Sequence, residues 1–115
     1  MELAMHKYWG LLRYYSYTYI IPQQEVFSAD EVADRIFVGD LYSAFNRKGL
    51  KSRSITHIIC MLPGIPNIYP EIAYLQLPSL DDVSFDISMY FTRAIVFLEQ
   101  AMKSGGSALI HCSCG

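Results

Sequence analysis

The sequence is poor in charged residues, and neither sign of charge dominates. Charged residues make up 17% of the 115 residues, and nine lysines and arginines against eleven aspartates and glutamates give a net charge of −2. A domain that binds nucleic acid usually carries a basic stripe or patch. The composition therefore excludes nucleic acid as an expected partner.

Cysteine is also scarce. The three cysteines are an odd number, and their positions lack the regular spacing of a disulfide framework. This usage is typical of a reducing compartment, so the expected location is the cytoplasm or the nucleus.

A hydrophobic run long enough to cross a membrane is lacking as well. The apolar amino-terminal stretch is interrupted by His6, Lys7 and Arg13, and it has no cleavage site of the kind that ends a signal peptide. What the chain does contain is 52% hydrophobic and 14% aromatic residues. That content and length predict one packed domain with no membrane span.

The most informative stretch is the last nine residues, Ser107 to Gly115. The apolar run Ala108–Ile110 follows two glycines and predicts a buried strand. The strand leads into His111 and Cys112 and then into small residues. In an open α/β sheet, ligands bind where strands end and loops begin, so Cys112 is a candidate functional thiol.

The rest of the chain alternates apolar runs with helical periodicity. Strands are predicted near 36–38, 57–62, 73–77 and 107–111, and helices over roughly 41–50, capped by Asp40, and 87–103, capped by Asp86 and closed by Gly105. The second helix is expected to bury one apolar face, formed by Ile87, Tyr90, Phe91, Ala94, Ile95, Leu98, Ala101 and Met102. The fold class is therefore α/β, with a largely parallel sheet flanked by helices.

Several pieces of the chain, in order, resemble the dual-specificity phosphatase family of cysteine-based protein tyrosine phosphatases. Ile110 to Gly115 is similar to the first half of the family's His-Cys-x5-Arg motif, and the resemblance extends from about Ala29 to Gly115. The other matching pieces are Ile36–Gly39, Ile55–Ile59, Tyr74–Pro78, Leu80–Asp82, Tyr90–Phe91 and Gly105–Gly106. The resemblance divides the chain into a tyrosine-rich extension, 1–27, and the amino-terminal part of a catalytic domain, 28–115.

The resemblance implies a phosphatase that acts on phosphorylated protein through a phosphocysteine, without cofactor or metal. Cys112 would be the nucleophile, and Cys112, Ser113, Cys114 and Gly115 would form the phosphate-binding loop. His111 would support that loop. Phosphotyrosine, phosphoserine, phosphothreonine, an RNA 5′-phosphate and a lipid phosphate all stay open as substrates, as does the oligomeric state.

Three aspartates lie in the predicted loop before the second helix. Asp86 has a structural role as the helix cap, which leaves Asp81 and Asp82 without one. The family carries its general acid on this loop, and the distance back from Tyr90–Phe91 favours Asp81 over Asp82. The interpretation as two solvated loop carboxylates remains the alternative from the residues alone.

The family's arginine falls six residues after the cysteine, beyond Gly115. We therefore expect the 115 residues to be a shortened phosphatase without activity, with strand 108–110 left half uncovered. One alternative is a pseudophosphatase that binds phosphoproteins without turnover. Others are an interaction fragment, and a zinc site on His111, Cys112 and Cys114, which would lack the usual fourth ligand.

Each of three smaller features has two possible interpretations. The tyrosines between Tyr8 and Tyr19 belong to an extension that is partly packed on the domain or poorly ordered, or to a platform for a partner. The basic cluster Lys48, Lys51 and Arg53 is a solvated helix end or a contact for phosphopeptide charge. Cys60, inside an apolar run, is expected to be a small buried residue and not a redox partner.

Overall fold

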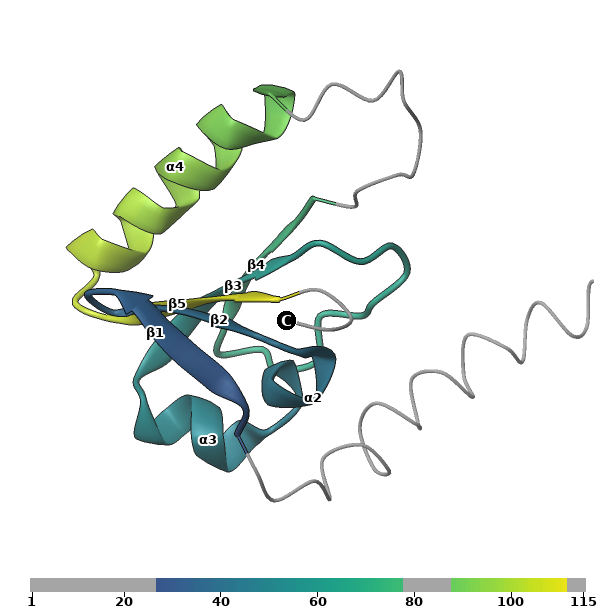
Figure 1. The fold of residues 1–115 in the computed structure, drawn as a ribbon, viewed down its shortest axis with the longest axis vertical. Helices are drawn as coiled ribbons and strands as arrows, with labels where there is room; N and C mark the ends of the chain where they lie inside the picture. The colour runs from purple at the N-terminus through teal and green to yellow at the C-terminus, as the bar shows by residue number, and fades with distance from the viewer. Residues whose placement is uncertain (1–26, 78–87, 112–115) are drawn as a thin grey trace, which may run out of the picture.

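A computed structural model of the chain describes residues 27–77 and 88–111. These residues form a five-stranded sheet with helices on both faces (Figure 1). The strands are β1 (Ala29–Ala33), β2 (Ile36–Gly39), β3 (Ile55–Cys60), β4 (Ala73–Gln76) and β5 (Ser107–His111). The helices are α2 (Leu41–Ala44), α3 (Arg47–Ser52) and α4 (Ser88–Lys103). No helix in this described part is long and apolar enough to cross a membrane.

The strand order is β1-β2-β5-β3-β4, and every neighbouring pair except β1 and β2 is parallel. The predicted fold class, a largely parallel sheet flanked by helices, is therefore confirmed. The last strand in sequence, β5, lies at the centre of the sheet between β2 and β3. Helices α2 and α3 cover one face of the sheet, and α4 covers the other (Figure 1).

Sequence patterns had not indicated β1, which pairs antiparallel with β2 across a tight turn. Arg35 sits in this turn with φ of 62°, a left-handed conformation that few side-chain-bearing residues adopt. Its Nη1 donates to the carbonyls of Met102 and Gly106, at 3.4 and 3.2 Å. A cation in this place satisfies carbonyls near the carboxyl end of α4 and so ties the hairpin to that helix.

The single helix predicted over 41–50 is wrong, because α2 and α3 are separate. The cap at Asp40 is as predicted: its Oδ1 accepts from the amide of Ser43 at 2.9 Å. Asn46 then interrupts the helix, with non-helical backbone angles of −95° and 86°. Its Oδ1 accepts from the amide of Gly49 at 2.9 Å, so the side chain caps α3 and replaces a helical backbone bond.

Helix α4 ends where the sequence predicted. Gly105 has φ of 79°, its amide donates to Met102, and the amide of Gly106 donates to Ala101. These two bonds are those of a Schellman motif, in which glycine supplies the left-handed residue. The start of the helix and the cap expected at Asp86 lie outside the described residues.

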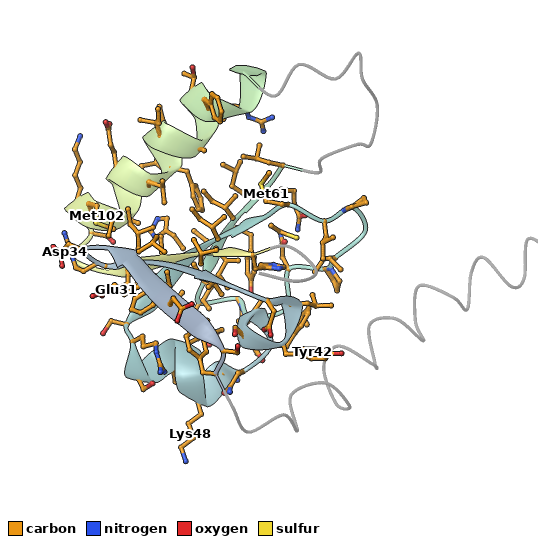
Figure 2. The ribbon with its side chains drawn as sticks, in the orientation of Figure 1. Glu31, Asp34, Tyr42, Lys48, Met61 and Met102 are labelled. Atoms are coloured by element: carbon orange, nitrogen blue, oxygen red, sulfur yellow. The ribbon has the colours of Figure 1, made fainter. Side chains whose placement is uncertain are left out.

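The core lies mainly between the sheet and the helices α2 and α3. Its buried members are Ala44, Leu50, Ile55, Ile58, Tyr69 and Leu109, with Phe37 and Tyr74 packed against them. Figure 2 shows how the side chains fill the space between the layers. Ala108 and Leu109 are fully buried and only Ile110 is half-buried, so the expectation of a half-uncovered central strand is wrong for two of its three residues.

The apolar face predicted for α4 is only partly buried. Ala101 is fully buried, and the ring of Phe97 packs edge-on against His57 of β3 at 5.0 Å between centroids. Phe91 and Ile95, by contrast, are more than half exposed. Because each helical residue advances about 100°, turning Phe97 and Ala101 toward the sheet turns Phe91 and Ile95 away from it.

This arrangement predicts different costs for two isoleucine truncations. Ile58→Ala removes a fully buried side chain from the core and is expected to lower the free energy of unfolding by about 2–5 kcal/mol. Ile95→Ala removes a side chain that is 56% exposed and should change it by less than about 1 kcal/mol. Urea denaturation of both variants measures this, and similar losses would contradict the orientation of α4.

Candidate active site

The candidate site lies at the carboxyl edge of the sheet, where the central strand ends. Register pairs Gly39 of β2 and Cys60 of β3 with His111, the last residue of β5. Cys60 is in turn paired with Gln76 of β4. Four parallel strands therefore end on one row, Gly39, His111, Cys60 and Gln76, and an open α/β sheet binds its ligands at such an edge.

Backbone hydrogen bonds keep neighbouring strands in register up to this edge. The amide of Met61 donates to the carbonyl of His111 at 2.9 Å, and the amide of Leu77 donates to that of Cys60 at 2.8 Å. Both bonds extend the parallel ladders one residue past β3 and β4. The chain therefore leaves the sheet at His111 from a fixed position.

His111 is almost completely buried, with 2% of its surface exposed. Side chains alternate along a strand, so His111 shares its face with Leu109, which belongs to the core beneath α2 and α3. Its burial at the end of β5 suits the supporting role that the sequence predicted. That role itself stays a prediction.

Cys60 borders the same edge but has the character of a core residue. Only 1% of it is exposed, its Sγ donates to the carbonyl of Leu62 at 3.4 Å, and burial raises the pKa of the thiol. A raised pKa disfavours the reactive thiolate. The expectation of a small buried residue is confirmed for Cys60.

The proline-rich segment after β3 is tied to this edge by polar side chains. Gln76 Nε2 donates to the carbonyl of Ile65 at 2.9 Å and to Asn67 Oδ1 at 2.7 Å. The hydroxyl of Tyr69 donates to the carbonyl of Phe45 at 2.8 Å. These bonds fix the segment between β3 and β4, which the sequence indicated only as a loop.

The reacting groups predicted from the sequence lie outside the described residues. These are Cys112, Ser113, Cys114 and Gly115 after β5, and Asp81 and Asp82 after β4. The structure places the strands that precede both groups at one edge, two strand positions apart. The alternative zinc site also falls partly outside the described residues, because two of its three proposed ligands are Cys112 and Cys114.

No family model matches the chain. A dual specificity protein phosphatase 1B from Arabidopsis thaliana is 33% identical over 86 residues, which are 74% of this chain and 52% of that protein. Among solved structures, DUSP15 matches with a TM-score of 0.70 and 25% identity, over 77% of this chain and 57% of the other. The human tyrosine phosphatase-like serine/threonine/tyrosine-interacting protein matches with a TM-score of 0.68 and 28% identity, over 78% and 65%.

These matches show that the five-stranded sheet with helices on its two faces has the fold of dual-specificity phosphatases. The chain belongs to the dual-specificity protein phosphatase family. It spans about half the length of the Arabidopsis relative.

Proposed function

We propose that this chain is part of a protein phosphatase that transfers the phosphoryl group of a phosphorylated protein to Cys112 and then to water. The supporting observation is the central position of β5, which ends in buried His111 directly before Cys112. Relatives in the dual-specificity family support the same class of reaction. We assign its location to the cytoplasm or nucleus on cysteine usage alone.

The proposed reaction has two steps. The Cys112 thiolate attacks phosphorus, an S–P bond forms, and the P–O bond to the protein substrate breaks. The carboxylic acid of Asp81 gives its proton to the departing oxygen. Water then attacks the phosphocysteine, Asp81 takes back a proton, and inorganic phosphate leaves as the thiolate is restored.

The thiolate requires a surrounding that lowers the cysteine pKa from about 8.5. In this proposal the backbone N–H groups of the Cys112–Gly115 loop, and the helix and arginine that follow it in the family, provide that surrounding. Those later elements lie beyond Gly115. Hydrolysis is therefore proposed for a carboxyl-extended chain, meaning this sequence continued through the arginine and the following helices.

The strand order makes a meeting of Asp81 and Cys112 feasible. Strands β4 and β5 are separated only by β3, and a spacing of about 4.8 Å between neighbours puts them roughly 10 Å apart. Asp81 is four residues beyond Leu77, and four extended residues reach about 13 Å. The strand order therefore allows the general acid proposed from the sequence to reach the proposed nucleophile.

A covalent intermediate tests this proposal directly. When the carboxyl-extended chain is mixed with a phosphopeptide and quenched in acid, we expect one phosphoryl group on Cys112, detected by peptide mass spectrometry. Cys112→Ser should carry none. Hydrolysis without any adduct, or an adduct on Cys114 alone, would contradict the assignment.

The second candidate function is binding of phosphorylated protein without turnover. The observation that favours it is the match to a solved human protein that is called phosphatase-like and interacting. The two functions differ in one measurement, because a binding protein would hold a phosphopeptide with Cys112 present and release no phosphate from the carboxyl-extended chain.

A further inference from the structure

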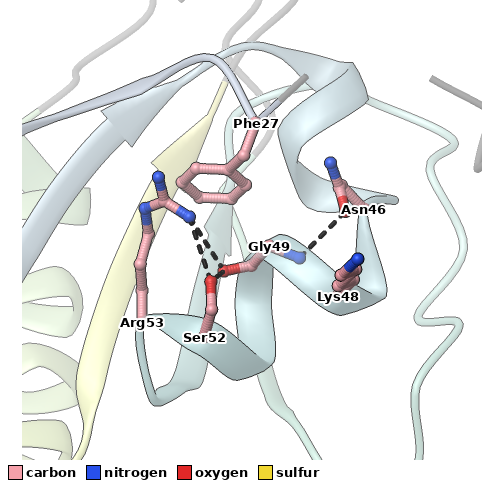
Figure 3. Close-up of a pocket in the computed structure, with 6 residues that line it drawn as sticks. All are labelled: Phe27, Asn46, Lys48, Gly49, Ser52 and Arg53. Atoms are coloured by element: carbon pink, nitrogen blue, oxygen red, sulfur yellow. Dashed lines mark hydrogen bonds between the residues drawn. The ribbon is translucent and has the colours of Figure 1, made fainter. Parts of the chain in front are cut away.

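A pocket lies away from the carboxyl edge, between Phe27 and helix α3. It has a volume of about 280 Å³ and is lined by Phe27, Asn46, Lys48, Gly49, Ser52 and Arg53 (Figure 3). Two of these described lining residues are cationic and none is a carboxylate. The pocket is therefore suited to an anion.

Arg53 is held in place by its neighbours. Its guanidinium carbon lies 4.1 Å from the centre of the Phe27 ring. Its Nη1 donates to the carbonyl of Gly49 at 3.3 Å and to Ser52 Oγ at 3.1 Å (Figure 3). Nε and Nη2 make no hydrogen bond with the described residues. An ordered guanidinium with an unused Nε–Nη2 edge presents the two parallel donors that bind phosphate or carboxylate oxygens.

The close approach of Phe27 depends on glycine at position 49. A Cβ there would come within 2.6 Å of the Phe27 Cδ2 atom, so any larger residue would push the ring away from α3. The ring in its observed place forms a wall of the pocket and stacks on Arg53. The sequence showed the basic cluster but gave no signal that a phenylalanine 26 residues earlier would order it.

Lys48 supplies the second charge. It is exposed, extends away from the body of the protein and has no ion-pair partner among the described residues (Figure 2). The neighbouring cation Arg47 differs, because its Nη2 contacts Glu71 Oε1 at 2.7 Å. Two cations on either side of one pocket, neither in contact with a carboxylate of the described residues, favour a dianion over a single carboxylate.

We propose that this pocket, which we call the Arg53 pocket, docks a phosphorylated side chain of a protein partner. The Arg53 edge and Lys48 would bind phosphate oxygens, and the Ser52 hydroxyl would lie beside them. A membrane is the less suited source of phosphate. Membrane-binding surfaces combine cations with apolar residues, whereas exposed Phe91, Ile95 and Val96 belong to α4 on the other face of the sheet.

The pocket is separate from the candidate active site. Arg53 precedes the amino end of β3 at Ile55, whereas the carboxyl edge begins at Cys60. Five residues of extended strand span about 17 Å. A phosphorylated partner could therefore be held here independently of hydrolysis, so the inference goes beyond the proposed function and does not rest on it.

Binding is tested with the 115-residue chain carrying Cys112→Ser, which removes the proposed nucleophile and so prevents turnover. The probe is a short phosphoserine peptide with neutral flanking residues, titrated while the backbone amides and the Arg53 Nε–H are followed by NMR. We expect chemical-shift changes at Gly49, Ser52 and Arg53. Arg53→Gln should raise the dissociation constant about tenfold, because the loss of a hydrogen bond to a charged group typically weakens binding by that factor.

Two further variants keep the test decisive. Within 27–77 and 88–111 the Lys48 side chain makes no hydrogen bond or ion pair. Lys48→Gln should therefore weaken binding and leave the melting temperature unchanged, even if Arg53→Gln disturbs Phe27. Arg93→Gln is the matched control, because it removes the same charge from exposed α4 and should leave binding unchanged.

Other outcomes would overturn the proposal. Equal affinity for the same peptide with glutamate in place of phosphoserine would show a general acidic contact and no phosphate site. Binding of phosphoinositide vesicles but not of the peptide would assign the pocket to membranes. Shifts confined to the His111 amide, unaffected by Lys48→Gln and Arg53→Gln, would place all phosphate binding at the carboxyl edge.

Discussion

The 115-residue chain is expected to show no Cys112-dependent hydrolysis of an aryl phosphate, and the carboxyl-extended chain is expected to hydrolyse it. The reason is the charge that must be stabilised in the transition state. In the family, an arginine after the loop contacts the phosphate oxygens with two parallel hydrogen bonds. Removing one such preorganised donor typically costs about 10²–10³ in rate, and the helix that lowers the thiol pKa would be lost with it.

Release of para-nitrophenol by the two chains measures this difference. Cys112→Ser in the carboxyl-extended chain should reduce turnover to background, whereas Cys114→Ser should retain most of it and serves as the matched control. Turnover by the 115-residue chain that disappears with Cys112→Ser would refute this account of the site. An inactive but folded extended chain would favour the binding function.

The second large effect is expected at the aspartates. In the carboxyl-extended chain, Asp81→Asn should lower turnover of a substrate with a poor leaving group by about 10²–10⁴, the usual contribution of a positioned acid. A serine or tyrosine oxygen leaves poorly unless it is protonated. Para-nitrophenolate leaves without help, so the same substitution should affect its release far less.

Asp82→Asn is the matched control, because it makes the same chemical change one residue away. It should have a small effect on both substrates. The pH profile gives an independent readout: an acid must be protonated to act, so the limb in which the rate falls with rising pH should disappear in Asp81→Asn. Equal effects of the two substitutions, or a larger one from Asp82→Asn, would show that the assignment is wrong.

Local pattern predicted much of the fold correctly. The strand predicted over 107–111 is found at Ser107–His111, and the helix predicted to end at 103 ends at Lys103. The strand predicted at 57–62 lies two residues earlier, at Ile55–Cys60. Apolar runs, and glycines that end a helix, are local signals. They therefore identify elements well and the boundaries of those elements less well.

The main errors arise where a feature leaves no apolar pattern in the sequence. Asn46 divides one predicted helix into two because its side chain replaces a backbone bond. The hairpin of β1 was missed because its strand is largely exposed and its turn places Arg35 in a left-handed conformation. Neither feature produces an apolar period that a sequence pattern could detect.

The sequence by itself predicted the class of chemistry. His111 and Cys112 after an apolar strand, with Asp81 on an earlier loop, carry the family resemblance, and reactivity belongs to residue type and order along the chain. Tertiary structure alone decided which segments meet. It put β5 between β2 and β3, brought the ends of β4 and β5 to one edge, and stacked Phe27 on Arg53. Such contacts join residues far apart in sequence, and they arise from burying apolar faces together, which no local pattern specifies.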